Sequence, residues 1–234
     1  MNANVNEQIF EIRYKANSKI LDYRGTWSEL LSDYLGLSEW KIVDNRIDIY
    51  NKQNTRHAFV GFSNTGFLCT NSPTRNFFYD QASKFYSFIV KQPGYDAAPQ
   101  VERFGVRSRF CINIDKSFKD IMELYLKSFC NQLESIKNVL GPEYVDIGTT
   151  LELKDKLGNY KLTSGAVELA QIKNLFRNIE EENSLPQVGL YFDLDYWVKP
   201  NKAMSEGDIC GLLKQFSETS WEKIENLVNT ITGS

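Results

Sequence analysis

One strand candidate, residues 101–114, constrains the fold of this chain more than any other segment. Strand periodicity divides its residues between two faces. The residues on one face are apolar: Phe104, Val106, Phe110 and Ile112. The other face carries three arginines and a glycine: Arg103, Gly105, Arg107 and Arg109. Guanidinium groups on one face repel unless a negative group lies beside them, and a glycine lets a neighbouring group approach the backbone.

A second strand candidate, residues 187–198, offers the negative groups that the arginines need. Phe192, Leu194 and Tyr196 share one of its faces, and Asp193, Asp195 and Trp197 share the opposite one. If the two strands are neighbours, their arginine and aspartate faces meet in a ladder of cross-strand ion pairs. Arginine–carboxylate pairs are often bidentate, so such a ladder would also define the strand register.

The same two segments contain the candidate ligand-binding residues of the chain: Arg103, Arg107, Arg109, Asp193, Asp195 and Trp197. An arginine row beside a glycine could hold an anionic ligand such as a phosphate. An Asp-x-Asp pair could hold a divalent metal for phosphoryl transfer. Trp197 could stack on a base or a sugar, although packing under the last helix is the simpler expectation. We predict no metal site, no catalytic residues and no cofactor.

Hydrophobic periodicity outlines the other elements. Strands are expected at 8–14, 40–50, 57–62, 65–69, 144–153 and 160–167. Helices are expected at 25–37, from 71–74 to the stop at 93–94, at 115–140 as one or two pieces, and at 205–231, while 168–182 is open to helix or strand. Each half of the chain therefore runs strand, helix, two or three strands and a long helix.

This order predicts an α+β fold made of two similar halves, residues 1–95 and 100–234, linked through 96–99. Each half would be a curved, mostly antiparallel sheet packed on a long helix, a helix-grip-like duplication. The halves would join edge to edge in one compact unit, which removes two sheet edges at the centre. Because 13% of the residues are aromatic, we expect an aromatic-rich core.

Composition limits which binding partners and which cellular compartment we expect for this protein. The formal net charge of −3 leaves no basic footprint, so we do not expect nucleic acid binding. No apolar run is long enough to cross a bilayer, and the polar start carries no targeting signature. Four cysteines without C-x-x-C spacing indicate buried free thiols in a reducing compartment. The protein is expected to be cytoplasmic. Its expected partner is an unidentified protein or a small anionic ligand, and the sequence leaves its oligomeric state open.

Catalytic motifs do not stand out. His57 is the only histidine, no Gly-x-Ser-x-Gly elbow accompanies it, and Gly-rich phosphate loops are absent. An enzyme is therefore the less favoured class. The leading hypothesis is a binding or protein-interaction module. The alternatives are a metal-dependent phosphoryl-transfer enzyme using Asp193 and Asp195, and a sensor or holdase-like protein that binds an anionic ligand or a peptide on its sheet.

Three segments carry a resemblance to a known family: the early strand over 8–14, the Arg103-x-Gly105-x-Arg107 strand, and the late Asp193-x-Asp195 strand followed by a long helix. In this order they resemble a sporadically distributed, uncharacterised bacterial family of chains of similar length. Ser108 and Arg109 stand where that family usually has an aromatic residue and Asn. The resemblance implies no activity, but the family's patchy distribution points to accessory or phage-defence genes.

Overall fold

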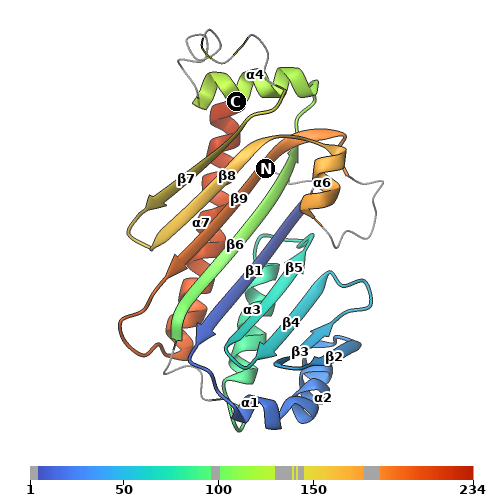
Figure 1. Ribbon diagram of the computed structural model, residues 1–234, viewed down its shortest axis with the longest axis vertical. Helices are drawn as coiled ribbons and strands as arrows, with labels where there is room; N and C mark the ends of the chain where they lie inside the picture. Colours follow the sequence, from blue (N-terminus) through green and yellow to red (C-terminus); the bar gives the residue numbers. More distant parts are fainter. Residues whose placement is uncertain are drawn as a thin grey trace.

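The protein is an α+β structure built on one antiparallel sheet of nine strands (Figure 1). The computed structural model describes residues 5–95, 101–129, 139, 141, 145–176 and 185–233. The strand order is β2-β3-β4-β5-β1-β6-β9-β8-β7. The strands are β1 (Val5–Tyr14), β2 (Glu39–Val43), β3 (Arg46–Tyr50), β4 (Arg56–Gly61), β5 (Asn64–Thr70), β6 (Val101–Asn113), β7 (Gly148–Lys154), β8 (Asn159–Glu168) and β9 (Val188–Val198).

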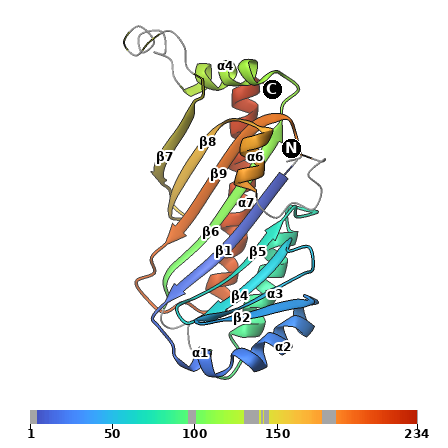
Figure 2. The same ribbon diagram turned by 45° about the vertical axis from the view of Figure 1, so that its right-hand side comes forward.

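The helices lie mainly on one face of the sheet. The long helix α7 and helix α3 cross behind it, α2 and α4 cover its two ends, and α6 lies on the opposite face (Figures 1 and 2). We call the face opposite α3 and α7 the open face. The helices are α1 (Lys19–Asp22), α2 (Arg24–Leu35), α3 (Phe77–Ile89), α4 (Phe118–Phe129), α6 (Leu169–Leu175) and α7 (Glu206–Thr232).

The main core lies between the sheet and the helices behind it, and it is rich in aromatic side chains as expected. Phe10, at the centre of β1, contacts the rings of Phe85 and Tyr86 on α3 and of Phe104 on β6. A second, smaller apolar cluster lies on the open face under α6 and includes Val5, Cys111, Ile172, Phe176 and Tyr191. The amphipathic pattern of α7 places its apolar stripe on the sheet.

The centre of the sheet is the pair formed by β1 and β6. Ten residue pairs join them, from Val5 opposite Cys111 to Tyr14 opposite Val101. Strands β2–β5 therefore extend the sheet on one side, and β9, β8 and β7 extend it on the other. Among the helices in the described ranges, none is long and apolar enough to span a membrane.

Several expected elements need correction. The segment 40–50 is not one strand but the hairpin β2–β3, because Asp44 and Asn45 form its two-residue turn. The helix expected over 115–140 is described only as α4, and the segment 168–182 begins as α6, where Glu168 and Gln171 form a capping box. The linker at 96–99 lies outside the described residues. Trp197 does not pack under α7, since its ring lies beside the Arg103 guanidinium.

At Gly66 on β5, the neighbouring strands β1 and β4 leave no room for a side chain. A Cβ there would lie 2.3 Å from the Phe10 carbonyl oxygen and 2.5 Å from the Phe59 ring, which covers Gly66 from β4.

Gly66→Ala should therefore lower the free energy of unfolding by about 1–3 kcal/mol, measured by urea denaturation. The matched control is Gly211→Ala on α7, where a Cβ meets nothing within 4 Å. That change should raise stability by about 0.5–1 kcal/mol. Equal stability of wild type and Gly66→Ala would contradict the close approach.

Candidate functional site

The arginine and aspartate segments are neighbouring strands, as the sequence predicts. Strand β6 pairs with β9 in antiparallel register, with Arg107 opposite Asp195 and Arg109 opposite Asp193. All of these side chains belong to the open face, because their strand neighbours Phe110, Phe192 and Leu194 are buried in the main core on the other side.

The hydrogen-bonded ion pair of Arg107 runs diagonally across the strands, whereas Arg109 lies straight across from Asp193, with its Nε 3.8 Å from Oδ2. Arg107 donates from Nε to Asp193 Oδ1 at 2.8 Å, and its Nη2 donates to Asp193 Oδ2, so the pair is bidentate. An arginine side chain is long enough to reach the diagonal cross-strand neighbour. The Asp193 side chain is only 10% exposed, and Tyr191 also donates its hydroxyl hydrogen to Oδ2 at 3.3 Å. The predicted ladder is therefore present, shifted by one pair along the strand.

Gly105 lets Arg103 join this network. The Arg103 guanidinium carbon would lie 3.5 Å from a Cβ on Gly105, so the side chain lies over the glycine along the sheet surface. From there Nη2 donates to Asp195 Oδ2 at 3.2 Å, and the guanidinium lies 5.6 Å from the centre of the Trp197 ring. The Arg103 guanidinium therefore occupies the space that a side chain at Gly105 would take. It lies between the Asp195 carboxylate and the Trp197 ring.

Arg109 connects the two halves of the sheet and α6. Its Nη1 donates to Glu7 Oε1 on β1 at 2.9 Å and to the Leu175 carbonyl oxygen at the end of α6 at 3.3 Å. Its Nε is buried and has no hydrogen-bond acceptor in the part of the chain that the structure describes. Asp193 Oδ2 lies 3.8 Å from this Nε, which is too far for a hydrogen bond.

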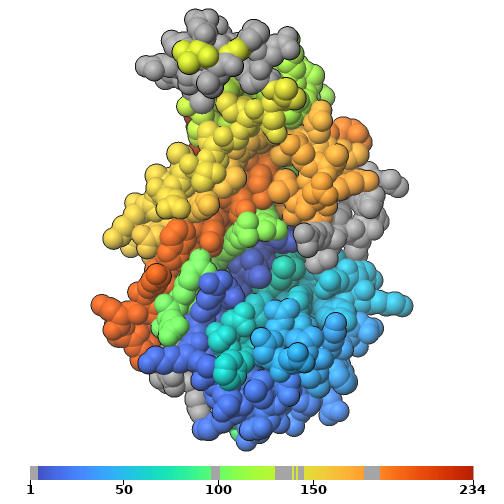
Figure 3. Space-filling view, in the orientation of Figure 1, coloured from blue at the N-terminus to red at the C-terminus, as the bar shows by residue number. Residues whose placement is uncertain are grey.

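A pocket of about 630 Å³ opens on this network where α6 ends. Figure 3 shows the face on which it lies, with β1, β6 and β9 crossing the centre and α6 beside them. Charged and polar lining residues are Glu7, Arg107, Arg109, Thr163, Asn174, Tyr191 and Asp193. Apolar lining residues are Ile9, Leu68 and Leu175. The volume falls in the range of small-molecule sites.

Burial shifts the protonation of the acidic groups in this network. Desolvation raises the pKa of Glu7 above 4.5, although the charges of Arg109 and Arg107 act in the opposite direction. Desolvation likewise raises the pKa of Asp195 above 3.8 against the charge of Arg103. The hydrogen bonds to Asp193 raise the pKa of Arg107, which is therefore cationic at every relevant pH. Burial also raises the pKa of Tyr191, so its hydroxyl is a neutral donor.

Asp193 and Asp195 hold arginines and do not converge on a common point. Within the described ranges, no group of three or more His, Cys, Asp and Glu side chains could hold a metal ion. His57 lies elsewhere on the sheet, where its Nε2 is 2.8 Å from Asp48 Oδ1. The pocket offers the guanidinium groups of Arg107 and Arg109 and the Asn174 amide as hydrogen-bond donors, beside the Glu7 and Asp193 carboxylates and an apolar border.

The structure brings the six predicted residues together, but the sequence did not indicate three further residues of the site, Glu7, Asn174 and Leu175. Arg103, Arg107, Asp193, Asp195 and Trp197 lie in one cluster with Arg109, as the structure shows. Glu7 was missed, although charges at alternate positions of the first strand, Glu7, Glu11 and Arg13, are a signal that a polar face exists there. Asn174 and Leu175 lie on α6, and nothing in their local sequence places them above β6.

No protein-family model and no curated protein matches this chain. The resemblance to the bacterial family therefore stays a prediction.

The Arg107–Asp193 pair should contribute measurably to stability. Arg107→Ala leaves the nearly buried Asp193 carboxylate without its bidentate partner, while Arg107 itself is 42% exposed. We expect a loss of about 1.5–3 kcal/mol in the free energy of unfolding, the range for hydrogen bonds to charged groups. Arg13→Ala is the control, since the Arg13 side chain is 55% exposed and its partner Glu11 is more exposed than Asp193, so the change should cost less than about 1 kcal/mol. Equal losses in the two variants would argue against a buried network.

Glu7 and Asp48 should give pH dependences of opposite sign. The folded protein binds the Glu7 proton more tightly than the unfolded chain, so the stability that this group contributes is present below pH 4.5 and is lost as the pH rises through its raised pKa. At Asp48, burial is outweighed by the hydrogen bond from His57 and the charge of Arg46, and the pKa lies below 3.8. Its contribution is present above pH 3.8 and is lost as the pH falls.

Denaturation of wild type, Glu7→Gln and Asp48→Asn between pH 3 and pH 7 measures both effects. The stability of wild type relative to Glu7→Gln should decrease with rising pH, and its stability relative to Asp48→Asn should increase. A flat difference for either variant would contradict the corresponding shift.

Proposed function

We propose that this protein is a non-catalytic binding module, and that its pocket at the end of α6 takes a small ligand bearing a carboxylate or phosphate group. Two guanidinium groups border the pocket, and each has a donor that no described residue satisfies. These donors are the buried Arg109 Nε and the Arg107 Nη1, since Asp193 engages only Nε and Nη2 of Arg107. The observation that carries the proposal is the pair of guanidinium groups in the pocket lining, because the Arg107 side chain is 42% exposed there and its Nη1 is left to donate to a ligand.

The charge balance of the pocket supports a ligand of modest charge. Glu7 and Asp193 already compensate Arg109 and Arg107, so a multiply charged anion would meet two carboxylates as well as two guanidinium groups. Ile9, Leu68 and Leu175 add an apolar border. The favoured ligand therefore has one anionic group for the arginines and a short apolar or hydroxylated body that Thr163, Asn174 and Tyr191 can contact.

Thermal unfolding with butyrate and with 4-hydroxybutyrate, each against chloride at the same ionic strength, tests the proposal with ligands that carry one anionic group. A ligand that binds only the folded protein raises stability by mass action, by about 2.7 kcal/mol at a hundred times its Kd. We expect a higher melting temperature for wild type and for the control Arg13→Ala. We expect no ligand-dependent rise for Arg107→Ala and a smaller rise for Asn174→Ala, which leaves every ion pair of the network intact.

A rise of equal size in all four proteins would indicate a general salt effect and would overturn the proposal.

Native mass spectrometry of the protein purified from its host adds an independent measurement, because a discrete small mass above 27.0 kDa would give the mass of the ligand. The competing hypothesis of a phosphoryl-transfer enzyme requires Mg²⁺ or Mn²⁺ to raise the melting temperature of wild type but not of Asp193→Asn.

We also propose that the two halves of the sheet arose by duplication. The first half orders its strands β3, β4, β5, β1 towards the centre, and the second orders them β7, β8, β9, β6. In each half the first strand in sequence lies at the centre and the last strand lies beside it. Each half then ends with a helix, α3 or α7, on the same face. This equivalence supports the helix-grip-like interpretation, with β2 as an additional strand of the first half.

A cytoplasmic location belongs to the same proposal. Cys69 and Cys111 are buried free thiols, which fits a reducing compartment. Burial raises the pKa of Cys111 to about 12, so this thiol is protonated and unreactive.

A further inference from the structure

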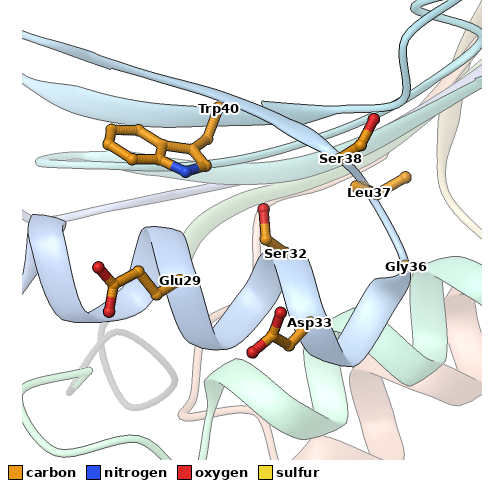
Figure 4. A pocket seen from close by; sticks show the side chains of 7 residues that line it. All are labelled: Glu29, Ser32, Asp33, Gly36, Leu37, Ser38 and Trp40. Carbon is orange, nitrogen blue, oxygen red and sulfur yellow. The ribbon is translucent and has the colours of Figure 1, made fainter.

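The free edge of β2 borders a groove on α2 that is separate from the pocket at α6. Strand β2 is the last strand on its side of the sheet, and α2, which the turn at residues 36–38 joins to it, runs beneath it (Figure 4). The groove measures about 610 Å³ and is lined by Glu29, Ser32, Asp33, Gly36, Leu37, Ser38 and Trp40. It combines an aromatic ring, two carboxylates and an adjacent strand edge.

The two carboxylates of the groove repel each other. Glu29 and Asp33 are four residues apart on α2, and like charges at this spacing destabilise a helix. Among the described residues, neither carboxylate has an ion-pair partner. Both are exposed along the wall of the groove. This arrangement favours a cationic group from outside the chain.

Apolar side chains are exposed on the same side of β2. Trp40 is 48% exposed and Ile42 is 41% exposed, and their cross-strand partners Ile49 and Ile47 are fully buried beside α2. The Trp40 ring lies above the groove, on the side towards which the Ser32 hydroxyl points (Figure 4). The Ser32 Oγ is buried and has no hydrogen-bond partner in the described part of the chain. An exposed indole beside carboxylates is a favourable site for a guanidinium or ammonium group.

The edge of β2 offers backbone groups next to this wall. In an antiparallel pair, alternate residues of an edge strand turn their N–H and C=O groups away from the partner strand. An extended segment can add to such an edge, where backbone hydrogen bonds give affinity and every second side chain faces the same side. Added beside β2, those side chains would lie next to Trp40, Glu29 and Asp33.

We propose that β2 binds an extended segment of a partner protein that carries basic side chains two residues apart. Side chains at this spacing on a strand are about 6.7 Å apart. Glu29 and Asp33 are separated by about 6 Å along the axis of α2. Two lysines or arginines of the segment would each meet one carboxylate, and one of them would lie against the Trp40 ring. A single amine could satisfy the aromatic ring but would leave the second carboxylate and the strand edge unused.

The test is the binding of a fluorescein-labelled peptide that alternates lysine and threonine to the full chain, followed by fluorescence anisotropy. We expect Trp40→Ala, and separately the double change Glu29→Gln with Asp33→Asn, to weaken binding by about tenfold or more. Glu222→Gln, an exposed carboxylate on α7, is the control and should leave the affinity unchanged. A peptide of the same composition with its lysines adjacent should bind at least about tenfold more weakly.

Amide hydrogen exchange separates strand addition from simple charge attraction. The alternating peptide should slow exchange in β2, and a peptide with N-methylated backbone should neither do so nor bind. Equal binding of both lysine arrangements, or an affinity that survives Trp40→Ala and the double change, would overturn the proposal. So would a dimer of the chain whose β2 amides are already protected without peptide, because a second copy would then occupy the edge.

Discussion

The pairing of β1 with β6 is the contact on which the rest of this structure depends. It joins two four-or-five-strand arrays into one sheet and brings Glu7 beside Arg109. Its register also sends Phe10, Phe104 and Val106 into the core behind the sheet. A slip of one residue would exchange the faces and place arginines among those aromatic rings. The alternation of β6 therefore specifies the register together with the hydrogen bonds of the ladder.

The ion pairs on the open face and a binding role are compatible. A guanidinium group has five donors in a planar fork, and a bidentate carboxylate uses two of them. Asp193 and Glu7 thus hold Arg107 and Arg109 in place at the pocket, while the Arg107 Nη1 keeps its hydrogens for a ligand. A cation held in this way loses less side-chain entropy when a ligand binds. Because these carboxylates offset the arginine charges, the net positive potential in the pocket is weak, which suits a ligand with a single anionic group.

Both outer edges of the sheet alternate charged and exposed apolar side chains. Strand β7 has Glu152 and Lys154, and its Leu151 and Leu153 are each 40% exposed. Strand β2 has Glu39 and Lys41 among its five residues, but the side that faces α2 shows Trp40 and Ile42. The β2 edge is therefore open to a partner on one side only, and the acidic wall of α2 restricts which partner that is.

The sequence by itself determined which residues face which side of each central strand. Period-two alternation predicted the faces of β6 and β9, because side-chain direction along a strand depends on local geometry alone. The pairing of these two strands, which brings the arginines beside the aspartates, belongs to the tertiary structure. The alternation did not separate β2 from β3, since it continues through the short turn at Asp44 and Asn45. Only the tertiary structure decided that Glu7 pairs with Arg109, and that α6 brings Asn174 and Leu175 to the pocket. These contacts join residues that are distant along the chain, and which strands become neighbours depends on the burial of the whole core rather than on any local pattern.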